Sequence, residues 1–218
     1  MKAAWTWRAR LYDILEASSL RRGPAKAELF RAMSGRVLFE ASGTGADFPC
    51  FPPGADVTAI DVNDEMLRRA AARRVSSAVH VRLLKADALA LPFGDGTFDT
   101  VATSCTLCSV PRPVRALQEL RRVLRPGGML LMFEHVRSRQ PLLGWTLDLM
   151  TLWSRRSGSE MNRDTLANAA AAGFRVTRVD SVYLDIILAI RARRDDQPSS
   201  GLPGSGPGDG VHPCPARP

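Results

Sequence analysis

A glycine turn and two carboxylates stand at positions that suit an adenosine-bearing ligand. Gly43, Thr44 and Gly45 follow an apolar stretch, and the two glycines let the backbone approach a ligand closely and adopt positive φ. Asp61 ends the next apolar stretch, where a carboxylate can accept hydrogen bonds from both hydroxyls of a ribose. Asp87 follows a third such stretch, where it can accept a hydrogen bond from the exocyclic amine of adenine. The turn lacks the third glycine of the GxGxxG fingerprint, so the set describes an adenosine site without a phosphate site.

Two further groups of side chains have types that could take part in chemistry. His135 directly follows a strand-like run, and because histidine titrates near neutral pH it is our candidate to orient or deprotonate an acceptor. The alternative is a structural histidine that hydrogen-bonds nearby backbone. Cys105 and Cys108 form a CxxC, but neither a thioredoxin-like context nor two further ligands accompany them. We therefore expect buried small residues here and no metal site.

Strand-like and helix-like segments alternate along most of the chain. Predicted strands cover residues 37–39, 57–60, 79–84, 98–103, 129–133, 174–182 and 184–190. Predicted helices cover residues 63–74, 112–124, 142–153 and 163–172, the first capped by Asn63. This alternation predicts an α/β fold with a doubly wound, mostly parallel sheet, whose ligand lies beyond the carboxyl ends of the strands. The glycine turn, Asp61, Asp87 and His135 each follow a strand, so they should gather at that edge.

The composition is that of a globular protein. The chain has 218 residues, 45% of them hydrophobic, and a formal charge of +8. We expect a main domain at residues 36–193, a helical lead-in at 1–35 that forms a lid, and a disordered Pro-, Gly- and Ser-rich tail at 194–218. Scattered arginine pairs are typical of solvated helix faces, although the charge also suits an anionic partner. Because no signal peptide or membrane-spanning run is recognisable, we expect a cytoplasmic protein.

Taken in order, these motifs resemble the class I, seven-stranded, Rossmann-like methyltransferases that depend on S-adenosylmethionine (SAM). The resemblance covers about residues 36–191 and rests on GTG at 43–45, Asp61 followed by NDEML, Asp87 followed by LPFGDGTFD, and RVLRPGG. The stretches TLCSV, EHV and NRDTL are similar to the branch of small alkyl-thiol methyltransferases, and more distantly to enzymes that methylate quinone precursors or phosphatidylethanolamine. The resemblance implies a seven-stranded sheet, SAM as cofactor and methyl transfer as the reaction.

The resemblance also implies which residues bind the cofactor. We expect these to be Gly43, Thr44, Gly45, Asp61, Val62, Asp87, Ala88, Ser104 and Tyr12. Tyr12, with Trp5 and Trp7, would form a lid over the sulfonium, because aromatic ring faces attract a cation. Packing of an N-terminal helix on the core is the alternative role for these aromatic residues. Ser104 and Cys105 would lie beside the methionine portion of the cofactor.

The opening turn departs from the family pattern. The usual ExGCGTG is FEASGTG here, with Phe39 at the position of the acid and Ala41 at the position of the first glycine. Glu40 comes one residue later and should point to the opposite side of its strand, because side chains alternate along a strand. Whether Glu40 meets the cofactor stays open, and so does the alternative of a degenerate SAM-binding module without catalysis.

The expected acceptor is small and rather apolar, with a thiol favoured over a phospholipid amine or a quinone-type carbon. A nucleic-acid acceptor is disfavoured, because the segment SCTLCSVP lacks the Asn/Asp-Pro-Pro-aromatic motif of enzymes that methylate base amines. The run 142–153 carries more hydrophobic surface than one helical face needs. We interpret it first as a wall of the acceptor pocket, with a peripheral membrane contact through 142–156 or a dimer contact as alternatives. The oligomeric state stays open.

Overall fold

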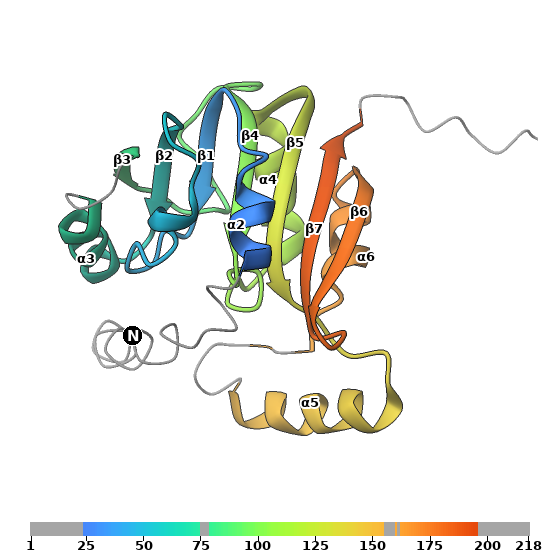
Figure 1. Cartoon of the computed structure of the whole chain (residues 1–218). Coiled ribbons are helices and arrows are strands. Elements are labelled where there is room, and N and C mark those ends of the chain that lie inside the picture. The colour runs from blue at the N-terminus through green and yellow to red at the C-terminus, as the bar shows by residue number, and fades with distance from the viewer. Residues whose placement is uncertain (1–23, 75–78, 155–159, 161, 196–218) are drawn as a thin grey trace, which may run out of the picture.

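Seven strands form one sheet in the order β3-β2-β1-β4-β5-β7-β6 (Figure 1). The computed structural model describes residues 24–74, 79–154, 160 and 162–195. The strands are β1 (Arg36–Glu40), β2 (Asp56–Asp61), β3 (His80–Lys85), β4 (Phe98–Ser104), β5 (Leu124–His135), β6 (Phe174–Tyr183) and β7 (Ile187–Arg194). The helices are α2 (Pro24–Phe30), the 3-10 helix η1 (Phe48–Cys50), α3 (Asp64–Arg74), α4 (Pro113–Val123), α5 (Pro141–Ser154) and α6 (Thr165–Ala171).

The sheet is parallel apart from one strand, β7. β3, β2, β1, β4 and β5 run parallel, whereas β7 lies antiparallel to both β5 and β6. This arrangement confirms the predicted doubly wound, mostly parallel sheet of seven strands. The chain builds outward from β1 in both directions, so β1 and β4 flank the point where the strand order reverses. Ligands of such sheets bind beyond the carboxyl ends of the strands at this switch point.

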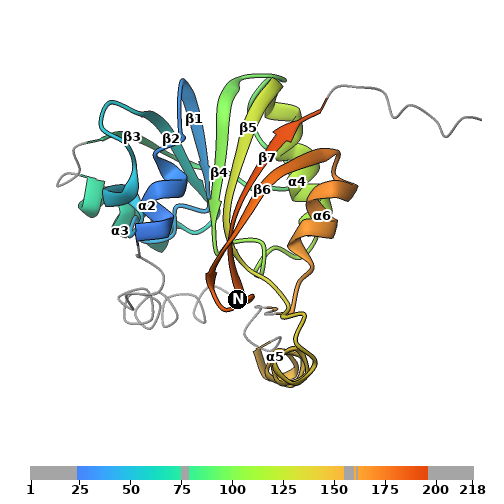
Figure 2. The same ribbon diagram turned by 45° about the vertical axis from the view of Figure 1, so that its right-hand side comes forward.

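Alternation along the strands divides the core into two apolar clusters, one on each face of the sheet. Leu38 of β1 belongs to a cluster with Leu117 and Leu120 of α4. Its neighbours Val37 and Phe39 belong to the cluster on the opposite face, which includes residues of α2. Figure 2 shows α2 and α3 on one side of the sheet and α4 and α6 on the other. Both faces of β1 are therefore covered by apolar side chains.

Helix α3 begins where the sequence predicts. The Asn63 side-chain Oδ1 accepts hydrogen bonds from the backbone N–H groups of Glu65, at 2.9 Å, and Met66, at 3.2 Å. This cap satisfies two of the N–H groups that a helix leaves unpaired in its first turn. The cap fixes the chain direction directly after β2, and with it the position of Asp61.

The largest boundary difference is at the start of β5, which begins at Leu124 and not at Met129. Leu124 pairs with Phe98 and Met129 with Thr100, and the register shifts between these pairs. Residues 125–128 form this irregularity, with Gly127 at a φ of 69°. The Pro-Gly-Gly signal therefore marks a bulge-like interruption inside the strand, and not its first residue.

Parts of the predicted organisation lie outside the described residues. These parts are residues 1–23 of the lead-in, which include Tyr12, and residues 196–218 of the tail. The described end of the lead-in is helical, as α2. Among the described residues, no helix is both long enough and apolar enough to cross a membrane.

Candidate active site

A cavity of about 410 Å³ lies at the carboxyl ends of the central strands. Its walls come from segments 40–43 at the end of β1, 60–66 at the end of β2, 86–89 after β3 and 105–111 after β4. The cavity therefore sits at the switch point of the sheet, where the sequence places the ligand. The predicted residues that line it are Gly43, Asp61, Val62, Asp87 and Ala88. The predicted Thr44, Gly45 and Ser104 are not among its lining residues.

Gly45 and Thr44 do not line the cavity but hold the glycine turn in place. Gly45 has a φ of 77°, and a Cβ added to it would lie 2.7 Å from Phe48 Cε2 and 3.0 Å from the Cα of Ala70. Thr44 is buried, and its hydroxyl and carbonyl oxygens accept hydrogen bonds from Arg73 of α3. Gly45 is thus needed for close packing of the turn against η1 and α3, and Thr44 anchors the turn to α3. The prediction that these two residues bind the cofactor stays a prediction.

Asp61 connects the glycine turn to the end of β2. Its Oδ2 accepts a hydrogen bond from the Gly43 N–H at 2.9 Å, and its Oδ1 accepts one from the Asn63 N–H at 2.9 Å. Burial raises the pKa of Asp61, while these backbone donors act in the opposite direction. Each carboxylate oxygen retains a second lone pair, so the side chain can still accept from two ribose hydroxyls.

Asp87 lies beside Asp61 on the neighbouring segment. The Ala86 N–H donates to the Asp61 carbonyl at 3.2 Å, which brings the two strand ends together. The Leu89 N–H donates to Asp87 Oδ1 at 2.8 Å and closes a tight turn. Asp61 and Asp87 therefore lie on adjacent segments of the cavity wall. The residues around them that line the cavity are Ile60, Val62, Met66, Ala86, Ala88 and Leu89.

Glu40 lines the cavity as well, although the FEASGTG turn shifts it by one residue from the usual position of the acid. Whether it meets the cofactor stays open. Phe39 points to the other side of β1, where its ring packs edge-on against Phe30 and Phe51 at centroid distances of 5.8 and 4.8 Å. Side chains therefore alternate along β1 as expected, and the side chain of Glu40 is on the side of the strand that faces the cavity. The turn is completed by Ala41, which adopts a φ of 55° at the position where the family usually has glycine.

The Glu134 side chain of β5 accepts hydrogen bonds from the end of β4 and from the turn that follows it. Its Oε1 accepts hydrogen bonds from the Thr103 hydroxyl at 2.7 Å and the Thr106 N–H at 3.2 Å, and its Oε2 accepts from the Leu107 N–H at 3.3 Å. Burial raises the pKa of Glu134 to about 7. These bonds hold the turn in which Cys105 adopts a φ of 51°. No sequence pattern singled out Glu134, because its partners lie about 30 residues away along the chain.

Comparisons with known proteins agree with this geometry. The family described as "Methyltransferase domain" matches residues 40–132, which include the glycine turn, both carboxylates and β4. These residues therefore match a methyltransferase domain. Similar solved structures include a SAM-dependent methyltransferase of Thermotoga maritima, with a TM-score of 0.66 and 22% identity over 89% of this chain and 100% of that one. Another, from Methanosarcina mazei, has a TM-score of 0.60 and 21% identity over 77% and 96%.

Curated relatives of the methyltransferase domain include enzymes for more than one acceptor. Human thiol S-methyltransferase TMT1B is 35% identical over 147 residues, which are 62% of this chain and 59% of that protein. The rat protein is 33% identical, with 61% and 57% covered. The ubiquinone/menaquinone biosynthesis C-methyltransferase UbiE of Bordetella avium is 40% identical over 49% of this chain and 43% of that protein. The chain thus spans less than three fifths of the length of these relatives.

The residues of the methyltransferase domain fit SAM, the cofactor of this family. Asp61 and Asp87 line the cavity and would offer acceptors to the ribose and the adenine, and Ile60 and Met66 would provide apolar contact for the base. Toward the methionine portion, Cys105 and Thr106 line the cavity, while Ser104 is buried behind them. The Cys108 thiol donates to the Cys105 carbonyl at 3.3 Å, so this CxxC is part of a buried turn. Within the described residues, no group of His, Cys, Asp and Glu has the geometry of a metal site.

His135 is not among the residues that line the cavity of the methyltransferase domain. It is the last residue of β5, pairs in register with Ile187 of β7 and is partly buried. Its assignment as a base stays a prediction, which the variant His135→Ala tests by comparing turnover with the Kd for SAM. A base or orienting group requires a large loss of turnover at unchanged Kd. An unaltered rate would make His135 a structural residue.

Proposed function

We propose that this chain transfers a methyl group from SAM to a small, rather apolar acceptor, and that the acceptor is a thiol. One observation carries the choice of a thiol: among the described residues that line the cavity there is no histidine, lysine or arginine, and two of its three carboxylates, Asp61 and Asp87, are assigned to the cofactor. A thiol needs little help to react, since free thiols titrate near ~8.5 and the thiolate is the nucleophile. A carbon or oxygen acceptor depends more strongly on a protein base. The similarity to the thiol S-methyltransferases supports the same choice.

The chain's own contribution to such a reaction is alignment and exclusion of water. SAM, when bound, supplies an electrophilic methyl group on its sulfonium. Asp61 and Asp87 fix the adenosine end, and the segment after β4 forms the opposite wall, with Cys105, Val110 and Pro111 as its apolar members. An apolar wall disfavours water and suits a thiol with a hydrocarbon substituent, so the acceptor sulfur would be held in line with the methyl group.

The test is incubation with methyl-labelled SAM and a panel of alkyl thiols, quinols, phosphatidylethanolamine and nucleic acid. We expect label in the thioether product, at a rate that rises with pH as the acceptor thiol ionises near ~8.5. Label in a quinol or in phosphatidylethanolamine would instead support the acceptor classes that the sequence ranks second. SAM binding without label in any acceptor would contradict catalysis and favour a binding module.

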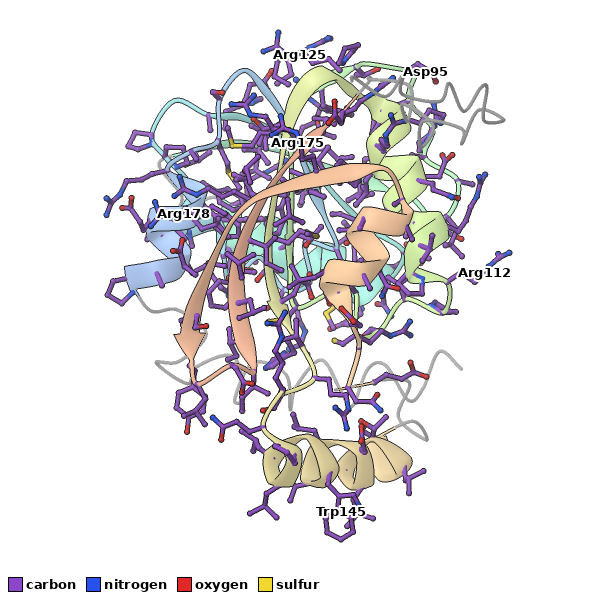
Figure 3. The ribbon with its side chains drawn as sticks, turned by 90° about the vertical axis from the view of Figure 1, so that its right-hand side faces the viewer. Asp95, Arg112, Arg125, Trp145, Arg175 and Arg178 are labelled. Carbon is purple, nitrogen blue, oxygen red and sulfur yellow. The ribbon has the colours of Figure 1, made fainter. Side chains whose placement is uncertain are left out.

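We also propose that α5 contacts a membrane surface, which would bring the site close to apolar acceptors. Leu142, Trp145, Leu149 and Leu152 recur at spacings of three and four, so they form one stripe along the helix. All four are more than half exposed, Leu142 at 77% and Trp145 at 63%, and Figure 3 shows Trp145 pointing away from the sheet. None of the α5 residues lines the cofactor cavity, so the stripe is not a wall of that cavity.

The charges around this stripe complement an anionic lipid surface. Asp148 is the acidic residue of α5, and it is held by Arg137, at 2.8 Å, and by Asn162, at 3.0 Å. Arg139 is exposed just before the helix, and the sequence places Arg155 and Arg156 just after it. An apolar stripe with basic residues at both ends is typical of helices that lie in a membrane interface.

Vesicle binding tests the role of α5. We expect the chain to sediment with phosphatidylcholine vesicles that contain phosphatidylglycerol, and the double variant Trp145→Ser/Leu149→Ser to partition roughly 10- to 100-fold less, because two large apolar side chains are lost. Val179→Ser, which changes an apolar residue of β6 that is 41% exposed, should partition like the wild type. Equal partitioning of the double variant would contradict the proposal. A dimer in solution that the same variant dissociates would replace it.

A further inference from the structure

The cavity wall that follows β4 is hydrogen-bonded to the segment between α5 and α6. Figure 1 shows α5 beyond the carboxyl end of β5, at the end of the sheet where the cavity lies. The Val110 carbonyl accepts a hydrogen bond from Arg163 Nη2 at 2.9 Å, and the Cys108 carbonyl accepts one from the Glu160 N–H at 2.8 Å. Carbonyl groups of an irregular, buried segment require such partners. The position of Val110, which lines the cavity, therefore depends on a residue 53 positions later in the chain.

The Arg163 side chain is itself held in place. It is only 13% exposed, and its Nη2 also forms an ion pair with Glu160 Oε2 at 3.1 Å. The Arg163 carbonyl accepts a hydrogen bond from the Arg137 N–H, just after β5, at 3.1 Å. The next residue, Asp164, caps α6 by accepting from the Ala167 N–H at 2.9 Å. Arg163 is thus fixed between β5 and α6, so its guanidinium keeps one position beside the cavity wall.

We infer that Arg163 is a positioning residue that determines which acceptors the site prefers, an inference that rests on the proposed function. The cofactor's adenosine end is assigned to Asp61 and Asp87, so the hydrocarbon substituent of the acceptor would contact the wall that Val110 and Pro111 form. Arg163 is not among the residues that line the cavity, so it acts through Val110 and not on the acceptor itself. By holding the Val110 carbonyl, it keeps this apolar wall in contact with the substituent.

This role makes the effect of Arg163 depend on the length of the acceptor. Alkyl thiols of different length share the same reacting group and differ in the hydrocarbon that the wall can cover. Each methylene that the wall buries should lower the acceptor KM by up to about fourfold. Loss of the bond between Arg163 and Val110 should therefore weaken long thiols and leave short ones almost unaffected.

Steady-state kinetics with SAM and a series of thiols tests this inference. Ethanethiol, butanethiol and hexanethiol are compared for the wild type, Arg163→Met and Arg163→Lys. We expect Arg163→Met to raise the KM for hexanethiol roughly 10-fold, and to leave both the KM for ethanethiol and the calorimetric Kd for SAM within about a factor of three. Arg163→Lys keeps a cationic donor for the Val110 carbonyl, so it should return the KM for hexanethiol to within about threefold of the wild type.

A second readout requires neither cofactor nor turnover. Amide hydrogen exchange of residues 105–111 in the free chain should become faster in Arg163→Met and stay close to the wild type in Arg163→Lys. Arg194→Met is the matched control, because Arg194 Nη1 donates to the Leu124 carbonyl at 2.6 Å at the opposite end of the sheet. This control should melt lower than the wild type, with unchanged exchange of residues 105–111 and an unchanged preference among the three thiols.

Each other outcome has a defined meaning. Equal increases of KM for all three thiols in Arg163→Met would overturn the inference, because the residue would then act on the thiol group or on the fold as a whole. Unchanged preference in Arg163→Met, or the same loss in Arg194→Met, would overturn it as well while leaving the proposed function intact. Absence of a thioether product from the wild type with every thiol would contradict the proposed function itself, and the inference with it.

Discussion

Replacing Asp61 by alanine is expected to remove measurable SAM binding. The carboxylate would contribute two charge-assisted hydrogen bonds to the ribose, each worth roughly 1.5 to 3 kcal/mol, so Kd should rise about 10²- to 10⁴-fold. A second effect adds to the first. Asp61 also accepts hydrogen bonds from the backbone of Gly43 and Asn63, so the variant loses the link between the glycine turn and the start of α3. Calorimetric titration with SAM measures the change.

The variant Asp56→Ala is the matched control for Asp61. Asp56 begins the same strand, at the edge of the sheet opposite the cavity, and its side chain is 52% exposed. It should bind SAM like the wild type. If Asp61→Ala kept wild-type affinity, the assignment of the ribose site would be wrong.

The second large effect concerns stability. The Lys26 side chain is completely buried, donates to Asp47 Oδ1 at 2.7 Å and lies over the Phe133 ring at 4.9 Å. Lys26→Ala would leave the carboxylate of Asp47 buried without its partner, and breaking such a pair typically costs about 3 to 5 kcal/mol. Because Asp47 follows the glycine turn by two residues, this pair fastens α2 to the wall of the cofactor site. Urea unfolding followed by circular dichroism measures the loss.

Two comparisons isolate the buried ion pair. Lys85→Ala breaks an ion pair of the same 2.7 Å length, but Lys85 and Asp64 are 56% and 68% exposed, so the free energy of unfolding should change by no more than about 1 kcal/mol. Lys26→Met/Asp47→Asn removes both charges together and should recover most of the stability lost by Lys26→Ala. A loss of stability no larger for Lys26→Ala than for Lys85→Ala would refute this account of the pair.

The pH dependence of the Lys26 variant follows from Glu134. Lys26 favours the ionised form of Glu134, whose folded-state pKa of about 7 exceeds its ordinary value of 4.5. Below pH 7 Glu134 is protonated in the folded protein, so removing Lys26 takes a cation away from a neutral group and lowers the free energy of unfolding less. Above pH 7 Glu134 is a carboxylate, so removing Lys26 lowers the free energy of unfolding more. The destabilisation by Lys26→Ala should therefore be larger at pH 8 than at pH 5.5.

Local signals in the sequence predict the sheet, its parallel centre and the adenosine end of the site. Asp61 and Asp87 each end or follow a strand, and the ends of neighbouring parallel strands meet by necessity. The Asn63 cap is likewise a local signal, since it depends on residues within three positions. The structure confirms the sheet and the cap. That Asp61 and Asp87 bind an adenosine group stays a prediction.

Features that depend on distant contacts were not predictable in the same way. The burial of Lys26 arises from Asp47 and Phe133, and the role of Glu134 arises from Thr103, Thr106 and Leu107. A lysine in a short helix and a glutamate near the end of a strand carry no local sign of such partners. The position of Glu40 depends on Phe39. Because Phe39 packs in the core on the other face of β1, the side chain of the next residue, Glu40, points to the cavity.

The central claim is that the cavity at the ends of β1 to β4 binds SAM, and titration of the wild-type chain with SAM tests it most directly. We predict saturable heat for one site per chain, a rise in melting temperature at saturating SAM, and competition by S-adenosylhomocysteine. Absence of both heat and thermal shift at saturating SAM would contradict the claim.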